Sequence, residues 1–114
     1  MKYRLLGGSG LMVSRIALGT MTFGVNEWGC DEKEAHRIMK KYMDSGGNFL
    51  DTADVYAGGK AEEIIGNFLP NISRDQVIIA SKCYFPVSNT PNAYGLSRKH
   101  IIDSCESSLK RMRT

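Results

Sequence analysis

The sequence predicts an α/β fold built on a parallel sheet, because short apolar runs alternate with longer stretches of helical periodicity. Three apolar runs have strand length, RIALGT (15–20), NFLDTA (48–53) and QVIIASK (76–82). Each is followed by a stretch in which apolar residues recur every three or four positions, over 31–47, 60–69 and 97–112. Such alternation indicates βαβ units and therefore parallel strands. The Val, Ile, Leu and Ala content of the runs further predicts a sheet covered on both faces.

A small hairpin is expected ahead of these units. The segment KYRLL–GGSG–LMVS (2–14) places two short apolar runs on either side of a glycine-rich turn. Gly7, Gly8 and Gly10 do not form a phosphate-binding loop, because they do not join a strand to a helix in the spacing that such a loop requires.

The first helix, over 31–47, has recognisable ends. Asp31 can cap its N-terminus, Glu34 can complete the reciprocal cap, and Gly46 or Gly47 can end it. Five apolar residues lie on one face and are predicted to be buried: Ala35, Ile38, Met39, Tyr42 and Met43.

The other two helices show the same one-sided pattern. In the helix over 60–69, Glu62 and Glu63 occupy the first turn, where the helix dipole favours negative charge. Its expected inward residues are Ala61, Ile64, Ile65, Phe68 and Leu69. Ser97 can cap the helix over 97–112, and its expected inward residues are Ile101, Cys105, Leu109 and Met112. His36 and His100 are interpreted as solvated helix residues.

The spacing of the strands suggests a particular architecture. They begin near Ile16, Phe49 and Val77, so one unit occupies roughly 30 residues. An eight-stranded barrel of about 250 residues has units of about 31 residues. We therefore predict a partial (β/α)8 TIM barrel, made of the N-terminal hairpin plus the first three β/α units, with residues 1–114 as one incomplete domain. Three units cannot close a barrel and leave two strand edges unpaired.

Composition excludes several classes of function. With 42% hydrophobic and 24% charged residues, the 114-residue chain has the composition of one globular domain. Its scattered net charge of +3 argues against nucleic-acid binding, and no apolar run approaches the roughly 18 residues of a membrane span. Three cysteines without CxxC spacing argue against a disulfide framework or a metal site and favour reduced thiols, so a cytoplasmic location is expected.

Three polar residues follow the ends of neighbouring strands. Asp51 lies near the end of the second run, Lys82 closes the third, and Tyr56 follows Asp51 by five residues. Because neighbouring strands are about 4.8 Å apart, Asp51 and Lys82 can pair at one edge of the sheet, and Tyr56 can fold over them. The pKa of a phenol is ordinarily about 10. An adjacent ammonium favours the ionised phenol, and a carboxylate orients the ammonium. Together they predict a proton donor for a carbonyl oxygen.

Four motifs together resemble the N-terminal part of an aldo-keto reductase. They are RIALGTMTFG, NFLDTADVYAGGKAEEIIGNFL, VIIASK and GLSRKHIIDSCESSLKRM, and they occur in the family's order. The segments GTMTFG and GGKAEEIIG are most similar to the bacterial and potassium-channel-beta-like branch. The resemblance implies a (β/α) barrel that passes hydride from NADPH to small aldehydes and ketones.

The resemblance also implies roles for particular residues. The family's catalytic Asp, Tyr and Lys correspond to Asp51, Tyr56 and Lys82. Its fourth catalytic residue is a His after the fourth strand, which lies beyond residue 114, and neither His36 nor His100 is placed to replace it.

Cofactor contacts are implied for the loop after the first strand. Gly19, Thr20 and Met21 resemble the segment that lies along NADP(H), and Asp51 is expected near the nicotinamide ribose. Thr20 has an alternative role, which is to satisfy backbone groups after the strand. Phe23 and Trp28 could equally line a substrate pocket or shield the edge of the core.

Two functions of different class remain open. The chain is either part of an NADP-dependent carbonyl reductase or a non-catalytic remnant or accessory piece that self-associates through its open sheet. Taken alone, Asp51 would more often be a turn or capping residue, and only the triplet with Tyr56 and Lys82 favours catalysis. For the isolated chain we expect self-association and little or no NADPH turnover.

Overall fold

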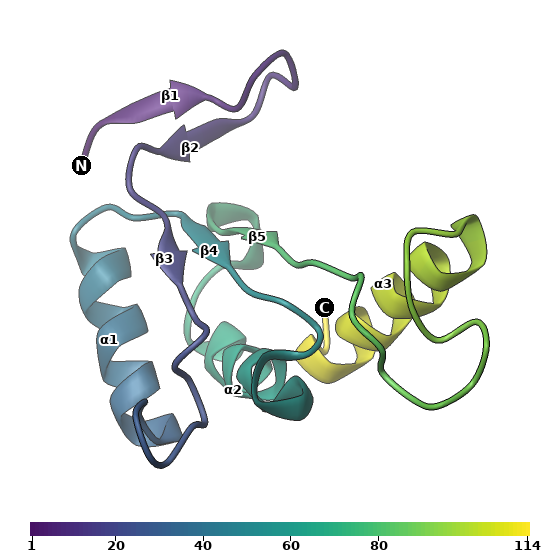
Figure 1. Cartoon of the computed structure of the whole chain (residues 1–114). Coiled ribbons are helices and arrows are strands. Elements are labelled where there is room, and N and C mark those ends of the chain that lie inside the picture. Colours follow the sequence, from purple (N-terminus) through teal and green to yellow (C-terminus); the bar gives the residue numbers. More distant parts are fainter.

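An antiparallel hairpin opens the chain, as predicted. The computed structural model describes residues 1–114. In it, β1 (Tyr3–Leu5) pairs with β2 (Met12–Ser14), and the hairpin forms an arm set apart from the helices (Figure 1). Side-chain hydrogen bonds tie this arm to the body, with Tyr3 Oη donating to the Gly46 carbonyl at 2.6 Å and Asn48 Nδ2 donating to that of Met12 at 3.0 Å.

The three predicted apolar runs form one parallel sheet. Its strands are β3 (Leu18–Gly19), β4 (Phe49–Asp51) and β5 (Ile78–Ala80), in the spatial order β3-β4-β5. Gly19 lies opposite Asp51, and Asp51 lies opposite Ala80. The strands are shorter than the apolar runs, but the parallel arrangement is confirmed.

Helices cover only one face of this sheet. Leu50 points to that face and is fully buried in the core, whereas its neighbours Phe49 and Asp51 point the other way and are half-buried. The expectation that both faces are covered is therefore wrong for this chain. In a closed barrel the second face would be the interior, and three strands are too few to enclose it.

The ends of α1 (Glu32–Asp44) follow the expected capping, with one change. Asp31 accepts a hydrogen bond from the Glu34 backbone N–H at 2.8 Å, and Gly46 adopts a left-handed φ of 84° just after the helix. The Glu34 carboxylate binds Arg37 at 2.6 Å instead of completing the reciprocal cap. None of the helices combines the length and apolar character that a bilayer crossing would need.

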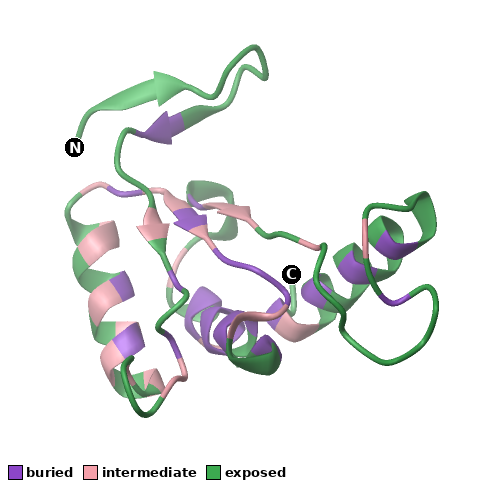
Figure 2. Cartoon of the chain, viewed as in Figure 1, coloured by how far each residue is buried: buried purple, intermediate pink, exposed green.

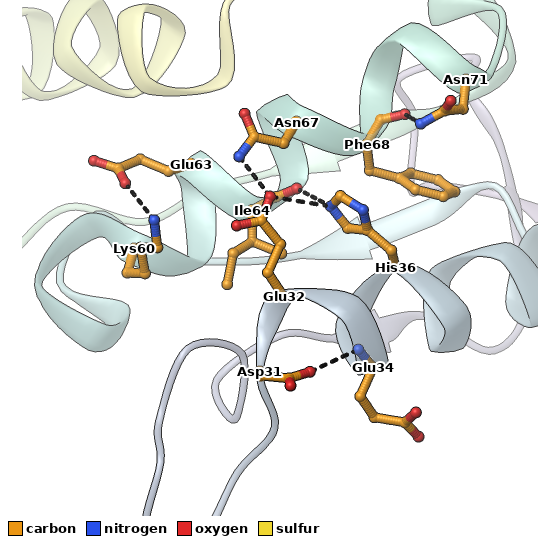
Figure 3. Close-up of polar contacts among 10 residues, drawn as sticks. All are labelled: Asp31, Glu32, Glu34, His36, Lys60, Glu63, Ile64, Asn67, Phe68 and Asn71. Carbon is orange, nitrogen blue, oxygen red and sulfur yellow. Dashed lines mark hydrogen bonds and ion pairs between the residues drawn. The ribbon is translucent and has the colours of Figure 1, made fainter.

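Polar contacts join α1 to α2 (Lys60–Phe68), and Figure 3 shows them. Asn67 Nδ2 donates to Glu32 Oε1 at 2.6 Å, and His36 Nε2 donates to the Ile64 carbonyl at 3.0 Å. The His36 ring also lies 5.5 Å from that of Phe68. His36 is therefore an interface residue, and the interpretation that it is solvated is wrong.

Three short 3-10 turns complete the path between the regular elements. η1 (Tyr56–Gly59) leads into α2, η2 (Leu69–Asn71) continues it, and η3 (Arg74–Gln76) precedes β5. After β5, a long loop reaches α3 (Arg98–Met112), which begins at the predicted cap Ser97.

The buried face of α3 differs from the predicted one. Ile101, Cys105 and Leu109 are exposed, and of the predicted inward residues only Met112 is buried. The residues that face the protein are His100, Ser104, Ser108 and Met112, as the stripe along α3 in Figure 2 shows. The apolar stripe lies over an open groove beside β5, so no further element covers it. The interpretation of His100 as solvated is also wrong.

Close approach of α2 and α3 depends on Gly66. A Cβ at this position would lie 2.7 Å from the Arg111 carbonyl oxygen and 2.7 Å from Met112 Cα, both backbone atoms. Only glycine allows the two helices to approach so closely.

Charged groups are buried beside this contact. Glu62 is fully buried and bonds Arg111, with Nε to Oε2 at 2.6 Å. Asp54 is 5% exposed, and its buried Oδ2 has no hydrogen-bond partner. Burial raises the pKa of the Asp54 carboxyl, the Glu62 charge raises it further, and Arg111 and His100 oppose the shift.

We expect Gly66→Ala to destabilise the fold by about 1–3 kcal/mol, because the added methyl group forces α2 away from the α3 backbone. Urea denaturation followed by circular dichroism measures this. Gly8→Ala is the control, since nothing lies within 4 Å of its Cβ position. Equal midpoints for the two variants would contradict the close-approach argument.

We expect Asp54→Asn to stabilise the protein at neutral pH by about 1 kcal/mol, because it removes an unpaired buried charge. The folded-state pKa lies above the ordinary value of 3.8, so the ionised carboxylate costs stability above the raised pKa and not below pH 3.8. The gain should therefore shrink as the pH falls through this window. Thermal melting at several pH values measures it, with exposed Asp75→Asn as control. A pH-independent difference would refute the assignment.

Candidate active site

The candidate site lies where β4 and β5 end. Asp51 is the last residue of β4 and lies opposite Ala80, and Lys82 follows Ala80 by two residues. Alternation along an extended chain places Asp51 and Lys82 on the same side of the sheet. Lys82 Nζ accordingly donates to Asp51 Oδ2 at 2.9 Å. Both residues lie on the face that carries no helix.

Tyr56 reaches this pair because the chain reverses after it. Ala57, Gly58 and Gly59 all have left-handed backbone angles, with φ values of 50°, 63° and 96°. For Ala57 this conformation costs about 1–2 kcal/mol relative to a right-handed one. The turn leaves Tyr56 Oη 3.2 Å from Lys82 Nζ, and the ammonium lies 4.9 Å from the centre of the phenol ring.

Lys82 uses all three of its N–H donors. Besides Asp51 and Tyr56, it donates to the Thr52 carbonyl at 2.8 Å. Burial by itself would lower the pKa of the Lys82 ammonium, but the hydrogen bonds from Lys82 to Asp51 and Tyr56 outweigh it and hold this pKa above its ordinary value. The amine is therefore a fixed cation at neutral pH.

The loop after β3 places the implied cofactor residues next to this cluster. Gly19 lies opposite Asp51. Thr20 is fully buried, and its Oγ1 donates to the Asp51 carbonyl at 3.0 Å. Its hydroxyl therefore satisfies a backbone carbonyl, which is the alternative role predicted for it. Met21 is exposed. Asp51 Oδ2 accepts from Lys82, and its half-exposed carboxylate retains acceptor capacity toward the open face.

The two aromatic residues of this loop have different environments. Phe23 belongs to the core cluster and is buried, so it shields the core, as one of its two interpretations stated. Trp28 is exposed on the surface, and a role in a substrate pocket stays a prediction. His36 and His100 both contact other helix residues and take no part in the cluster.

Sequence reasoning missed a layer of residues behind the site. Ser81 Oγ donates to Glu62 Oε1 at 2.6 Å, and the buried Thr52 hydroxyl has no partner. Glu62 was interpreted only as a favourable charge in a first helical turn. Its position was a usable signal, because Ile65 and Leu69 follow it by three and seven residues and Gly66 by four, which places it on the buried face.

Comparison with known proteins identifies the fold and the family. The profile of the Aldo/keto reductase family matches residues 15–114. The chain is 39% identical to a putative aryl-alcohol dehydrogenase of Schizosaccharomyces pombe, with 98% of this chain and 40% of that protein covered. It is 43% identical to a probable voltage-gated potassium channel subunit beta of Oryza sativa, with 98% and 34% covered.

A solved structure gives the same result in three dimensions. An aldo-keto reductase of Bacillus halodurans, in its holo form, superposes with a TM-score of 0.84 at 34% identity, and the match covers 100% of this chain and 37% of that one. The chain thus spans less than half the length of these relatives, and the prediction of part of a (β/α)8 barrel is confirmed. Because the family profile matches nearly the whole sequence, the chain belongs to the aldo/keto reductase family.

Proposed function

We propose that this chain carries the proton-donating site of an NADPH-dependent reductase that converts aldehydes and ketones to alcohols. One observation carries the proposal, which is that Lys82 Nζ bonds Asp51 Oδ2 and Tyr56 Oη at the same time. Membership of an oxidoreductase family supports it.

Tyr56 is the proton donor in this proposal. When bound, the reduced nicotinamide supplies a hydride to the carbonyl carbon. Tyr56 Oη gives its proton to the carbonyl oxygen, which completes the alcohol and leaves a phenolate. Lys82, at 3.2 Å, stabilises the charge that develops on this phenolate oxygen. Asp51 neutralises and orients the ammonium, since their contact is 2.9 Å.

The residues present suit the nicotinamide end of such a cofactor. The half-exposed Asp51 carboxylate can accept a hydrogen bond from a ribose hydroxyl, and exposed Met21 offers an apolar surface at the end of β3. Gly19 has no side chain to obstruct approach. The choice of NADPH over NADH follows the family resemblance.

A small aromatic carbonyl compound is the proposed substrate. The name of the Schizosaccharomyces pombe relative refers to aryl alcohols. In this chain, Trp28 is exposed in the loop after β3, and Tyr84 and Phe85 are exposed just beyond Lys82 with ring centres 5.5 Å apart. Aromatic side chains bind aromatic ligands by offset or edge contacts.

We also propose a reducing, cytoplasmic location. Cys30, Cys83 and Cys105 are all free thiols. Free cysteines persist where the surroundings keep thiols reduced.

A second candidate function is self-association through the open side of the sheet. The outer edge of β5 pairs with no strand, and an apolar groove of about 280 Å³ lies between it and α3. Ile79, Ile101 and Leu109 line this groove, and the last two are exposed. Unpaired strand edges beside apolar surface favour association.

We expect the isolated chain to oxidise NADPH hardly at all with an aromatic aldehyde, but to do so once fused to the part of the Bacillus halodurans reductase that it does not cover. In this fusion, Tyr56→Phe should lower kcat by about 100-fold or more, because the proton donor is lost. Absorbance at the reduced-nicotinamide band measures turnover. Tyr94→Phe is the control, since Tyr94 is exposed and its hydroxyl takes no part in the contacts of Lys82 with Asp51, Thr52 and Tyr56. Full activity of the Tyr56 variant would exclude the proposed role.

We expect the isolated chain to form dimers or larger species, and Leu109→Lys to weaken this association at least about tenfold by placing a charge in the groove. Sedimentation velocity over a concentration series measures it. Leu96→Lys, at an exposed loop residue outside the groove, is the matched control. A wild-type chain that stays monomeric and melts in one sharp transition would rule out this candidate.

A further inference from the structure

Glu62 is a fully buried carboxylate with two donors of its own. Arg111 Nε donates to Oε2 at 2.6 Å and Ser81 Oγ donates to Oε1 at 2.6 Å. Each carboxylate oxygen therefore has a partner, which is the condition for a charge to remain in a protein interior. These contacts connect α2, α3 and the segment after β5.

Ser81 immediately precedes Lys82, so its contact with Glu62 bears on the orientation of the Lys82 side chain. Successive side chains of an extended segment point to opposite faces. The Ser81 hydroxyl therefore points to the helix side and the Lys82 amine to the open side. The backbone around them is held by the Thr52 N–H, which donates to the Ala80 carbonyl at 2.8 Å, and by the Asp54 N–H, which donates to that of Lys82 at 3.1 Å.

These backbone bonds hold the segment on the β4 side only, because its other edge pairs with no strand. Only two side-chain anchors act on it: Ser81 is bound to Glu62 on one face, and Lys82 is bound to Asp51, Thr52 and Tyr56 on the other. Lys82 is half-exposed and lies at an unpaired edge, so its own contacts are open to competition from water.

We infer that Glu62 is a positioning residue, which through the Ser81 hydroxyl holds Lys82 Nζ within reach of Asp51 and Tyr56. A contribution of Glu62 to catalysis rests on the proposed function, whereas its effect on the position of Lys82 does not. Glu62 is well placed for this task, because it lies in the first turn of α2, directly after the η1 turn that begins with Tyr56. One side chain thus relates the positions of the phenol and the amine.

The Glu62 carboxylate serves both contacts. Two oxygens accept from two donors, Arg111 and Ser81. A glutamine has one oxygen and one NH2 group, so it could still accept from Arg111 and donate to the Ser81 hydroxyl, which also accepts, whereas an alanine removes both contacts. Glu63, the next residue, offers a matched comparison, because its carboxylate lies at the surface against Lys60 at 3.1 Å.

The test measures how readily Lys82 reacts with an amine-acylating reagent in the 114-residue chain, by mass spectrometry of its peptides. Exposed Lys33 in α1 serves as internal reference. In Ser81→Ala, we expect Lys82 to react at least about threefold faster relative to Lys33, because an amine released from its acceptors loses its proton more easily. Ser81→Thr keeps the hydroxyl and should react as the wild type does. Glu62→Ala removes the partner of the Ser81 hydroxyl and should match Ser81→Ala, and Glu63→Ala should match the wild type.

The inference is overturned if Ser81→Ala leaves the reactivity of Lys82 unchanged, or if Ser81→Thr raises it equally. Ser81 is exposed, so its truncation removes no packing from the core, and this pair decides the matter even if Glu62→Ala fails to fold. The acylation of Lys82 is measured without any carbonyl reduction. If Ser81→Ala raises the reactivity of Lys82 but the Tyr56→Phe fusion is fully active, the proposed function is excluded and the positioning role stands. If Lys82 reactivity is unchanged but the Tyr56→Phe fusion is inactive, the positioning role is excluded and the proposed function stands.

Discussion

The ammonium of Lys82 holds the residues of the candidate site together. It joins the end of β5 to the end of β4 through Asp51 and to the start of η1 through Tyr56. Such contacts form only if the two strands are parallel and in the observed register, because a shift of one residue would turn Lys82 to the helix-covered face. The register, the turn after β4 and the candidate site are thus one structural arrangement.

Support for this arrangement comes from behind the sheet. Gly66 lets α3 approach α2, and the approach brings Arg111 to the buried Glu62. Glu62 then receives the Ser81 hydroxyl. A charged residue in the interior is thereby neutralised by α3 and made available to the strand segment that carries the amine. Close helix packing and side-chain orientation at the site are coupled through one carboxylate.

Much of the fold follows from local patterns. Apolar runs, the caps Asp31 and Ser97 and the glycine after α1 were sufficient to place the three α-helices and the parallel strands. The pattern failed along α3, where Ile101 and Leu109 are exposed. Periodicity shows that a helix has an apolar face, but it does not show whether another element covers that face. The same reason explains why both faces of the sheet were expected to be covered.

By itself, the sequence determined the family resemblance, the order of strands and helices, and the three residues Asp51, Tyr56 and Lys82, because these depend on spacing along the chain and on residue chemistry. Tertiary structure alone decided that Thr20 turns its hydroxyl to the backbone, that His36 bonds α2 and His100 is buried, and that Glu62 is buried against Ser81 and Arg111. These hydrogen bonds join residues 19 to 49 positions apart. No local pattern encodes which distant partner a polar side chain will meet.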